Sequence, residues 1–218
     1  MKYIGREEII TDTKDWTVPK ARDQKFQVAL YGAGGSGSIN GNYFQDVGGA
    51  GGGSGDYAFK ELELKEGDRI HIEIGKGGEG MTGSDKVADY IGHIVGKTGG
   101  TTSFGEYLFA VGGLGGNINQ GGDGANDGGA TGETAEGHYF GNGSSGTVDG
   151  LNYTSGGGGA AVNARGVGGS AEFNQGNGGT SAGGAGCFVE KVDGKVSRRI
   201  GAGGNGVCII TYYAPIGG

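Results

Sequence analysis

Short runs of alternating apolar and polar residues recur along the chain and predict β-strands. In the run from Lys25 to Tyr31, the side chains of Phe26, Val28 and Leu30 fall on one face. No segment shows sustained helical periodicity, so the pattern predicts an all-β chain of about eight to ten strands, enough for an antiparallel β-sandwich. The other predicted strands are Glu7–Thr11, Asp15–Pro19, Tyr57–Lys65, Arg69–Gly75, two within Thr101–Gly113, a hairpin within Gly186–Gly201 that turns at Asp193-Gly194, and Gly206–Ala214.

One predicted strand changes the face that carries its apolar residues. Tyr57 and Phe59 fall on one side of it, whereas Leu62 and Leu64 fall on the other. A β-bulge inserts one residue and would bring both pairs to the same side. The pattern therefore predicts a bulge near Lys60–Glu61.

Three glycine-rich tracts, 32–55, 75–100 and 112–186, separate the predicted strands. Glycine makes up 58 of the 218 residues but there are only 2 prolines, which excludes a collagen triple helix. Glycines three apart, such as Gly77, Gly80 and Gly83, match the repeat of a left-handed polyproline II helix. A flexible linker is the alternative. Because strands hold the ends of the tracts, we expect the tracts to pack as an ordered polyglycine II bundle inserted in one domain, residues 1–218.

Composition disfavours several classes of partner. The formal net charge is −7, which argues against a nucleic-acid binder. No apolar run has the length of a membrane span, and the first residues lack the apolar core of a secretory signal. The two cysteines, Cys187 and Cys208, both lie in predicted strands, where buried free thiols are favoured over a disulfide.

The sequence matches a nucleotide-binding motif without the structural context that this motif needs. Gly32, Gly34 and Gly37 spell G-x-G-x-x-G after a predicted strand. That fingerprint needs a helix whose N-terminus holds the pyrophosphate, and the residues after Gly37 cannot form one. Glycine here instead favours close packing of backbone on backbone.

The sequence offers no pattern of catalytic or metal-binding residues. Gly121–Gly129 is similar to a calcium-binding repeat, but no tandem copy follows. His71, His93 and His138 are too widely spaced for a metal motif, and His71 is predicted to be a surface strand residue. We therefore expect no enzyme activity, no cofactor and no metal.

Aromatic and amide residues form islands between the glycine runs. Large aromatic faces combined with amide hydrogen bonds are typical of binding surfaces. An alternative places Phe44, Phe140 and Phe173 in the seam between the glycine bundle and the sandwich. The predicted ligand-binding residues are Asn42, Tyr43, Tyr90, His138, Tyr139, Asn152, Tyr153 and Asn174.

An ordered set of motifs covers nearly the whole chain. It comprises "WTVP", "GAGG", "IEIGKGGEG", "GGTTSFG" and the closing "GGNGVCIITYY". The set resembles the glycine-rich domain of bacteriophage tail-fibre and receptor-binding proteins. It is also similar to the glycine-rich region of anaplastic lymphoma kinase, and the tip adhesins of T-even-like phages share the polyglycine bundle. The resemblance implies a sandwich of jelly-roll or TNF-like type.

The resemblance also implies a function. We expect a virion protein of the tail fibre or tail tip, made in the host cytoplasm, that binds a host surface glycan or protein. Its other partners would be further tail or fibre proteins, and a homotrimer is a further expectation. Because no shaft precedes the first predicted strand, we expect a separate cap, tip or decoration protein. The alternatives are a purely structural virion protein and an ice-binding protein.

Overall fold

The computed structural model describes residues 2–42, 45–47, 50–82, 93–117, 147–149, 152–154, 177–182, 184, 188–192 and 195–216. These residues form strands and a single 3-10 turn, η1 (Arg22–Gln24), which confirms the predicted all-β class. Two four-stranded antiparallel sheets hold most of the long strands. The first sheet has the order β1 (Tyr3–Ile10), β16 (Val207–Pro215), β3 (Lys25–Tyr31), β6 (Tyr57–Glu63). The second has the order β11 (Leu108–Ala110), β10 (Thr102–Phe104), β7 (Arg69–Glu73), β2 (Lys14–Thr17).

The two sheets share one hydrophobic core. Phe26, Val28 and Leu30 of β3 are fully buried, as their alternation predicts. The ring of Trp16 in the second sheet meets that of Phe26 edge-on, with 5.6 Å between the ring centres. Burying a side chain of this size contributes about 1.5–3 kcal/mol, so this core stabilises the end of the molecule formed by the two sheets, here called the sheet end.

The predicted bulge in β6 is absent. Strand β6 pairs with β3 in unbroken register from Lys25↔Glu63 to Tyr31↔Tyr57. The two apolar pairs of β6 serve different clusters: Leu62 packs in the shared core, whereas Tyr57 packs against Tyr31 in a second cluster that also includes Val207. Because apolar groups lie on both faces of the sheet here, no bulge is needed.

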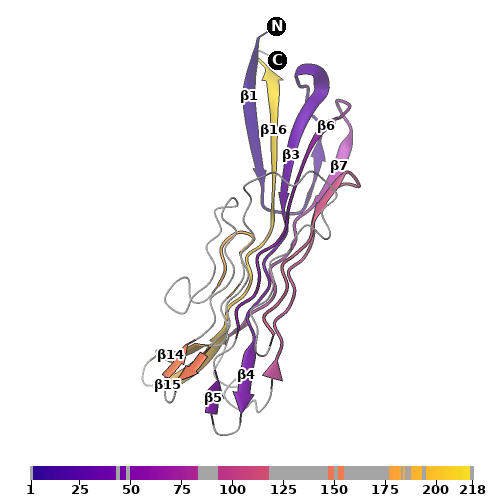
Figure 1. Cartoon of the computed structure of the whole chain (residues 1–218). Helices are drawn as coiled ribbons and strands as arrows, with labels where there is room; N and C mark the ends of the chain where they lie inside the picture. The colour runs from indigo at the N-terminus through magenta and orange to yellow at the C-terminus, as the bar shows by residue number, and fades with distance from the viewer. Residues whose placement is uncertain are drawn as a thin grey trace.

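Both chain termini lie at the sheet end (Figure 1). Strand β1 pairs with β16 along its whole length, from Tyr3↔Pro215 to Ile10↔Cys208. The N–H of Ile216 donates to the carbonyl of Lys2 at 2.9 Å and extends this pairing by one step.

Below the two sheets, glycine-rich segments run side by side along the long axis of the molecule (Figure 1). We call them the glycine array; in the described part of the chain they are 32–38, 50–56, 75–80, 95–101, 111–117, 181–182 with 184, and 201–206. Segment 32–38 lies at the centre. Its N–H groups donate in rotation to three neighbours at 2.8–3.1 Å: Gly32, Gly35 and Ser38 to segment 50–56, Ala33 and Ser36 to segment 95–101, and Gly34 and Gly37 to segment 201–206.

The other three neighbours donate to carbonyls of the central segment. Gly78, Gly113 and Gly184 donate to Gly34, Ala33 and Gly35 respectively, at 2.8–2.9 Å. The six outer segments are also hydrogen-bonded to one another in a closed ring. Its order is 50–56, 111–117, 95–101, 75–80, 201–206 and 181–182 with 184, which bonds back to 50–56. The central segment thus has six hydrogen-bonded neighbours among the described residues. This arrangement satisfies backbone groups that could not be buried unpaired.

Glycine is required because the segments touch backbone to backbone. A Cβ added to Gly35 would lie closer than 3.0 Å to the backbone of Gly113 and Leu114, and one added to Gly99 would meet Ala33 and Gly34 in the same way. Real Cβ atoms do not approach other atoms so closely. The three glycines of the G-x-G-x-x-G pattern, Gly32, Gly34 and Gly37, therefore lie in the central segment of this array.

The array leads to short strands at the end opposite the termini, here called the far end (Figure 1). The hairpin predicted around Asp193-Gly194 is present, because β14 pairs with β15 from Phe188↔Arg199 to Val192↔Lys195. The tracts predicted as glycine-rich insertions also contain short strands. The strands outside the two large sheets are β4 (Ile39–Asn42), β5 (Gln45–Val47), β8 (Met81–Thr82), β9 (His93–Ile94), β12 (Thr147–Asp149), β13 (Asn152–Thr154), β14 (Phe188–Val192) and β15 (Lys195–Ile200).

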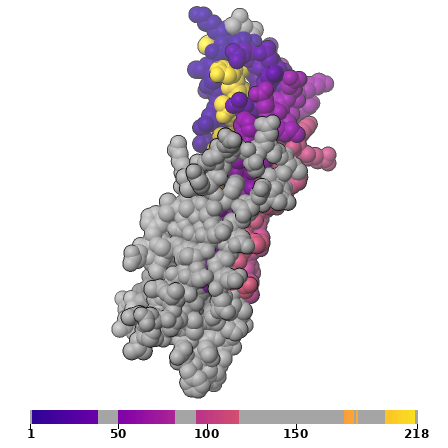
Figure 2. All heavy atoms as spheres, in the orientation of Figure 1, coloured from indigo at the N-terminus to yellow at the C-terminus, as the bar shows by residue number. Residues whose placement is uncertain are grey.

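Figure 2 shows that the described residues form the surface of the sheet end and one side of the molecule below it.

Of the two cysteines, Cys208 lies in β16 as a buried free thiol, and burial raises its pKa to about 12. Cys187 lies outside the described residues.

Candidate functional site

The far end carries one of the predicted binding residues. Asn42 is the last residue of β4 and pairs with Gln45 of β5, while Asn40 of the same strand pairs with His93 of β9. These pairings build a three-stranded sheet in the order β5-β4-β9. Figure 1 shows β4 and β5 at the opposite end of the molecule from the termini.

Two further predicted residues lie on β13. Asn152 pairs with Asp149 of β12, and Tyr153 pairs with Val148. The structure therefore assigns Asn42 and the Asn152–Tyr153 pair to different sheets. The other predicted binding residues lie outside the described part of the chain: Tyr43, Tyr90, His138, Tyr139 and Asn174.

A polar cluster lies on the second sheet, on the face opposite the core. Strand pairing sets Asp15 of β2 directly across from His71 of β7, and Thr17 across from Arg69. Their neighbours Trp16 and Ile70 face the core, so alternation turns Asp15 and His71 outward. The His71 side chain is 61% exposed, which confirms the prediction of a surface strand residue.

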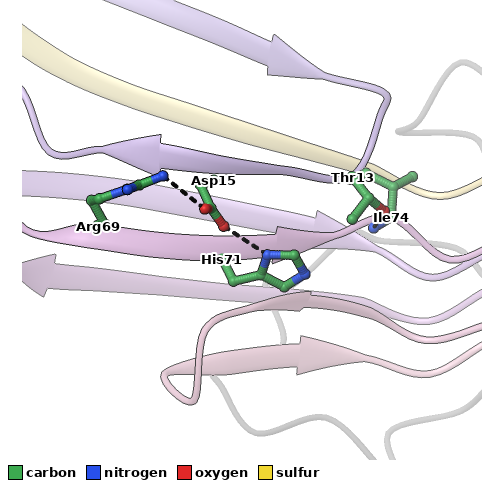
Figure 3. Close-up of polar contacts among 5 residues, drawn as sticks. All are labelled: Thr13, Asp15, Arg69, His71 and Ile74. Atoms are coloured by element: carbon green, nitrogen blue, oxygen red, sulfur yellow. Dashed lines mark hydrogen bonds and ion pairs between the residues drawn. The ribbon is translucent and has the colours of Figure 1, made fainter.

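Asp15 holds both basic neighbours (Figure 3). Its Oδ1 lies 2.8 Å from His71 Nδ1, and Arg69 Nη2 donates to its Oδ2 at 3.0 Å. An ionised carboxylate can only accept hydrogen bonds, so the proton of a neutral His71 ring sits on Nδ1 and leaves Nε2 as an acceptor. The hydrogen bond from His71 and the nearby charge of Arg69 hold the pKa of Asp15 below its usual value.

The strand that carries Asp15 is fixed at its start. Thr13 Oγ1 accepts the N–H of Ile74 at 3.0 Å, next to the point where β7 continues into array segment 75–80 (Figure 3). This contact continues the β2–β7 pairing beyond Lys14↔Ile72. This contact helps to hold the register that sets Asp15 opposite His71.

A surface depression of about 590 Å³ adjoins the cluster. Arg69 and His71 line it from β7, and Glu106 and Tyr107 line it from the turn between β10 and β11. Gly105 begins this turn with a positive φ of +51°, a conformation that glycine adopts without strain. The side chain of Tyr107 is left 45% exposed.

The cluster has part of a catalytic arrangement. An Asp–His pair supports hydrolysis when a nucleophile donates to the free imidazole nitrogen. In the described part of the chain no hydroxyl or thiol hydrogen-bonds to His71.

The described residues include no group of three or more His, Cys, Asp or Glu side chains suited to hold a metal ion. They also include no helix long and apolar enough to span a membrane.

Comparison with known families adds one finding. A family model described as "Glycine-rich domain" matches residues 10–213. The chain belongs to the glycine-rich domain family. The match covers the buried residues of the shared core and the whole array, whereas of β1 it includes only Ile10. A search of curated proteins found no match to this glycine-rich domain.

Sequence reasoning missed the cluster of this glycine-rich domain. Asp15 and His71 are 56 residues apart, and only the β2–β7 register brings them together. The available signal was the outward alternation of Arg69, His71 and Glu73 in the Arg69–Gly75 run. That alternation marks an exposed face without identifying the strand that pairs with it.

Proposed function

We propose that the chain is a bacteriophage tail-fibre or tail-tip protein that binds the host cell surface through loops displayed by a polyglycine bundle. Its membership of the glycine-rich domain family supports this proposal. So does the ordered set of motifs, from Trp16–Pro19 to Gly203–Tyr213, that resembles tail-fibre and receptor-binding proteins.

In this proposal the glycine array is a bundle of polyglycine II helices. The hydrogen bonds of segment 32–38 return to the same neighbour every third residue, which is the repeat of such a helix. Among the described glycines only Gly67 and Gly105 have positive φ, and both lie outside the array. At about 3.1 Å per residue, the seven residues of the central segment span roughly 22 Å.

The sheet end is in this view a β-sandwich of jelly-roll or TNF-like type. Its eight strands lie in two antiparallel sheets of four, the strand number of a jelly roll. The shared core, with Phe26 and Trp16 in contact, supports face-to-face packing of the two sheets.

The observation that carries the proposal is the separation of the two ends. Both termini lie at the sheet end, and β4 with Asn42 lies at the far end (Figure 1). A rigid spacer of hydrogen-bonded backbone segments between the two ends would hold the binding loops away from the virion. The sheet end would then dock on other tail or fibre proteins, and the far end would meet a host glycan or surface protein.

Further parts of the proposal concern partners and chemistry. The protein is a virion component made in the host cytoplasm, it does not insert into membranes or bind nucleic acid, and it catalyses no reaction. The net charge of −7 supports the lack of nucleic-acid binding. A homotrimer stays a prediction, and sedimentation equilibrium tests it by measuring the molar mass of the assembly.

The experiment compares virions that carry single substitutions. Tyr43→Ala, Tyr139→Ala and Tyr153→Ala should slow adsorption to host cells while particle number and tail composition stay unchanged. Leu114→Ala is the control, because Leu114 is an exposed apolar side chain (50%) in array segment 111–117, outside both the sheet end and the far end. Normal adsorption of all three variants would contradict the proposal. Failed particle assembly would favour the alternative, a purely structural virion protein.

A further inference from the structure

The depression beside Asp15 has rigid walls on both sides. On one side, Asp68 is fixed by a turn: its N–H donates to the Lys65 carbonyl at 3.1 Å, and its own carbonyl accepts the N–H of Val18 at 2.8 Å. On the other side, the N–H of Gly105 donates to the His71 carbonyl at 2.8 Å. Both walls are tied to the second sheet by backbone hydrogen bonds, so the depression keeps its shape without a ligand.

The polar groups in the depression are held in place before any ligand binds. Arg69 and His71 line the depression, and Asp15 binds both from outside its lining. Holding a long side chain near its bound position lowers the ordering cost of the binding step. After this pairing, Arg69 keeps further N–H donors and His71 keeps Nε2 as an acceptor.

The depression also offers an aromatic ring. Tyr107 is 45% exposed, and its ring centre lies 6.3 Å from that of Phe104, which is fully buried. Contact with Phe104 holds the tyrosine ring, while much of its surface stays open to solvent. An aromatic surface beside hydrogen-bonding groups suits a ligand with apolar C–H faces and hydroxyl edges.

The charges in the depression select against anions. Arg69 is neutralised by Asp15, which leaves the carboxylates of Asp68 and Glu106 without a salt-bridge partner among the described residues. These groups accept hydrogen bonds from hydroxyl donors and repel phosphates and acidic sugars. The combination favours a neutral ligand rich in hydroxyl groups.

We propose that this depression is a binding site for a neutral pyranose sugar, which stacks on Tyr107 and shares its hydroxyl groups with Arg69, His71 and the two carboxylates. The site lies at the sheet end, away from the far-end residues of the proposed host contact. The inference therefore goes beyond the proposed function and does not depend on it.

The test titrates the ¹⁵N-labelled full chain with the methyl glycosides of glucose, galactose, mannose and N-acetylglucosamine. At least one of them should shift the amide signals of Gly105, Glu106 and Tyr107 in a saturable way, with a dissociation constant of roughly millimolar order. Tyr107→Ala should weaken that binding about tenfold, the loss expected for one aromatic contact. Tyr213→Ala, which removes a tyrosine of similar exposure outside the depression, should leave it unchanged.

Asp15→Ala tests the positioning role of the carboxylate. It should weaken binding several-fold, and the ring ¹⁵N shifts of His71 should show that the proton no longer prefers Nδ1. Asp15→Glu, which keeps a carboxylate, should restore part of both.

Absence of a saturable shift with all four glycosides up to about 50 mM would overturn the proposal, since that concentration corresponds to under 2 kcal/mol of binding. Binding of unchanged affinity in Tyr107→Ala would also overturn it. If no glycoside binds but Tyr107→Ala disturbs assembly of the sheet end with another protein, the depression is a protein contact and not a sugar site.

Discussion

A single methyl group at the centre of the array should destabilise the molecule strongly. Gly35 lies in the central segment, its N–H donates to the Gly53 carbonyl, and its own carbonyl accepts the N–H of Gly184, both at 2.9 Å. A Cβ at this position would lie closer than 3.0 Å to the backbone of Gly113 and Leu114. Backbone atoms cannot rotate away as a side chain can, so Gly35→Ala must push segment 111–117 outward.

The size of the effect follows from two contributions. Overpacking a dense interior costs about 1–3 kcal/mol. Segment 111–117 is held to the central segment by two backbone hydrogen bonds, from the N–H of Gly113 to the Ala33 carbonyl and from the N–H of Gly116 to the Ser36 carbonyl. Each contributes about 0.5–1.5 kcal/mol, and both weaken when the segment moves outward. The sum is about 2–6 kcal/mol. In a chain of this length each kcal/mol lowers the melting temperature by roughly 2–4 °C.

Calorimetry of Gly35→Ala measures the loss, and Gly5→Ala is its matched control. A Cβ at Gly5 in β1 would meet only Tyr213 Cε1, at an ordinary contact distance of 3.8 Å. The control should melt within about 2 °C of the parent protein. Amide exchange should then show whether the loss is local: protection of 32–38 should fall more than protection of β3. If Gly35→Ala melts like the control and keeps its protection, the backbone-contact argument is refuted.

Three further changes probe buried polar groups. Ser38→Ala removes a hydroxyl that accepts the Ala50 N–H at 3.0 Å and donates to the Asn117 carbonyl at 2.8 Å, so denaturant titration should show a loss of about 1–3 kcal/mol, against almost none for the exposed Thr11→Ala. Burial raises the pKa of Tyr31 and of Tyr212 from 10.0 to about 12, so their contribution to stability holds below pH 10 and is lost as the pH rises toward 12. Tyr212→Phe should make that alkaline loss in unfolding free energy smaller, and an equal loss would contradict the assignment. Because burial also raises the pKa of Cys208 to about 12, peptide mapping should find Cys208 unalkylated by iodoacetamide at pH 8 until the protein unfolds.

Period-two alternation was sufficient to predict the core. Ile70 and Ile72 are 5% and 0% exposed, as expected for inward positions of a half-buried strand. The bulge predicted in β6 was wrong because alternation assumes that only one face of a strand is buried, whereas Tyr57 packs in a second cluster on the other face of the sheet. Lys60 shares a face with Ala58 and Leu62, yet β6 is an edge strand, where a lysine stem can reach solvent past the sheet.

The three-residue spacing of glycine indicated close backbone packing but could not give the neighbours. Gly34 pairs with Gly204, 170 residues later, whereas Gly35 pairs with Gly53. Nearly identical G-x-x repeats carry no information that would assign one partner or the other. The candidate sugar site was hidden for the same reason, because Asp15 meets His71 only through strand register.

The strands that flank glycine segments supply the pairing information that the glycine repeats lack. Segment 32–38 starts directly after β3 and segment 201–206 ends directly before β16, and β3 pairs with β16 down to Tyr31↔Val207. Gly34 and Gly204 each lie three residues beyond that last pair, so strand register alone brings them together. The side chains of the sheets thus choose the partners, and glycine permits the backbones to meet. A change that shifts β3 against β16 would therefore misalign the array as well as the core.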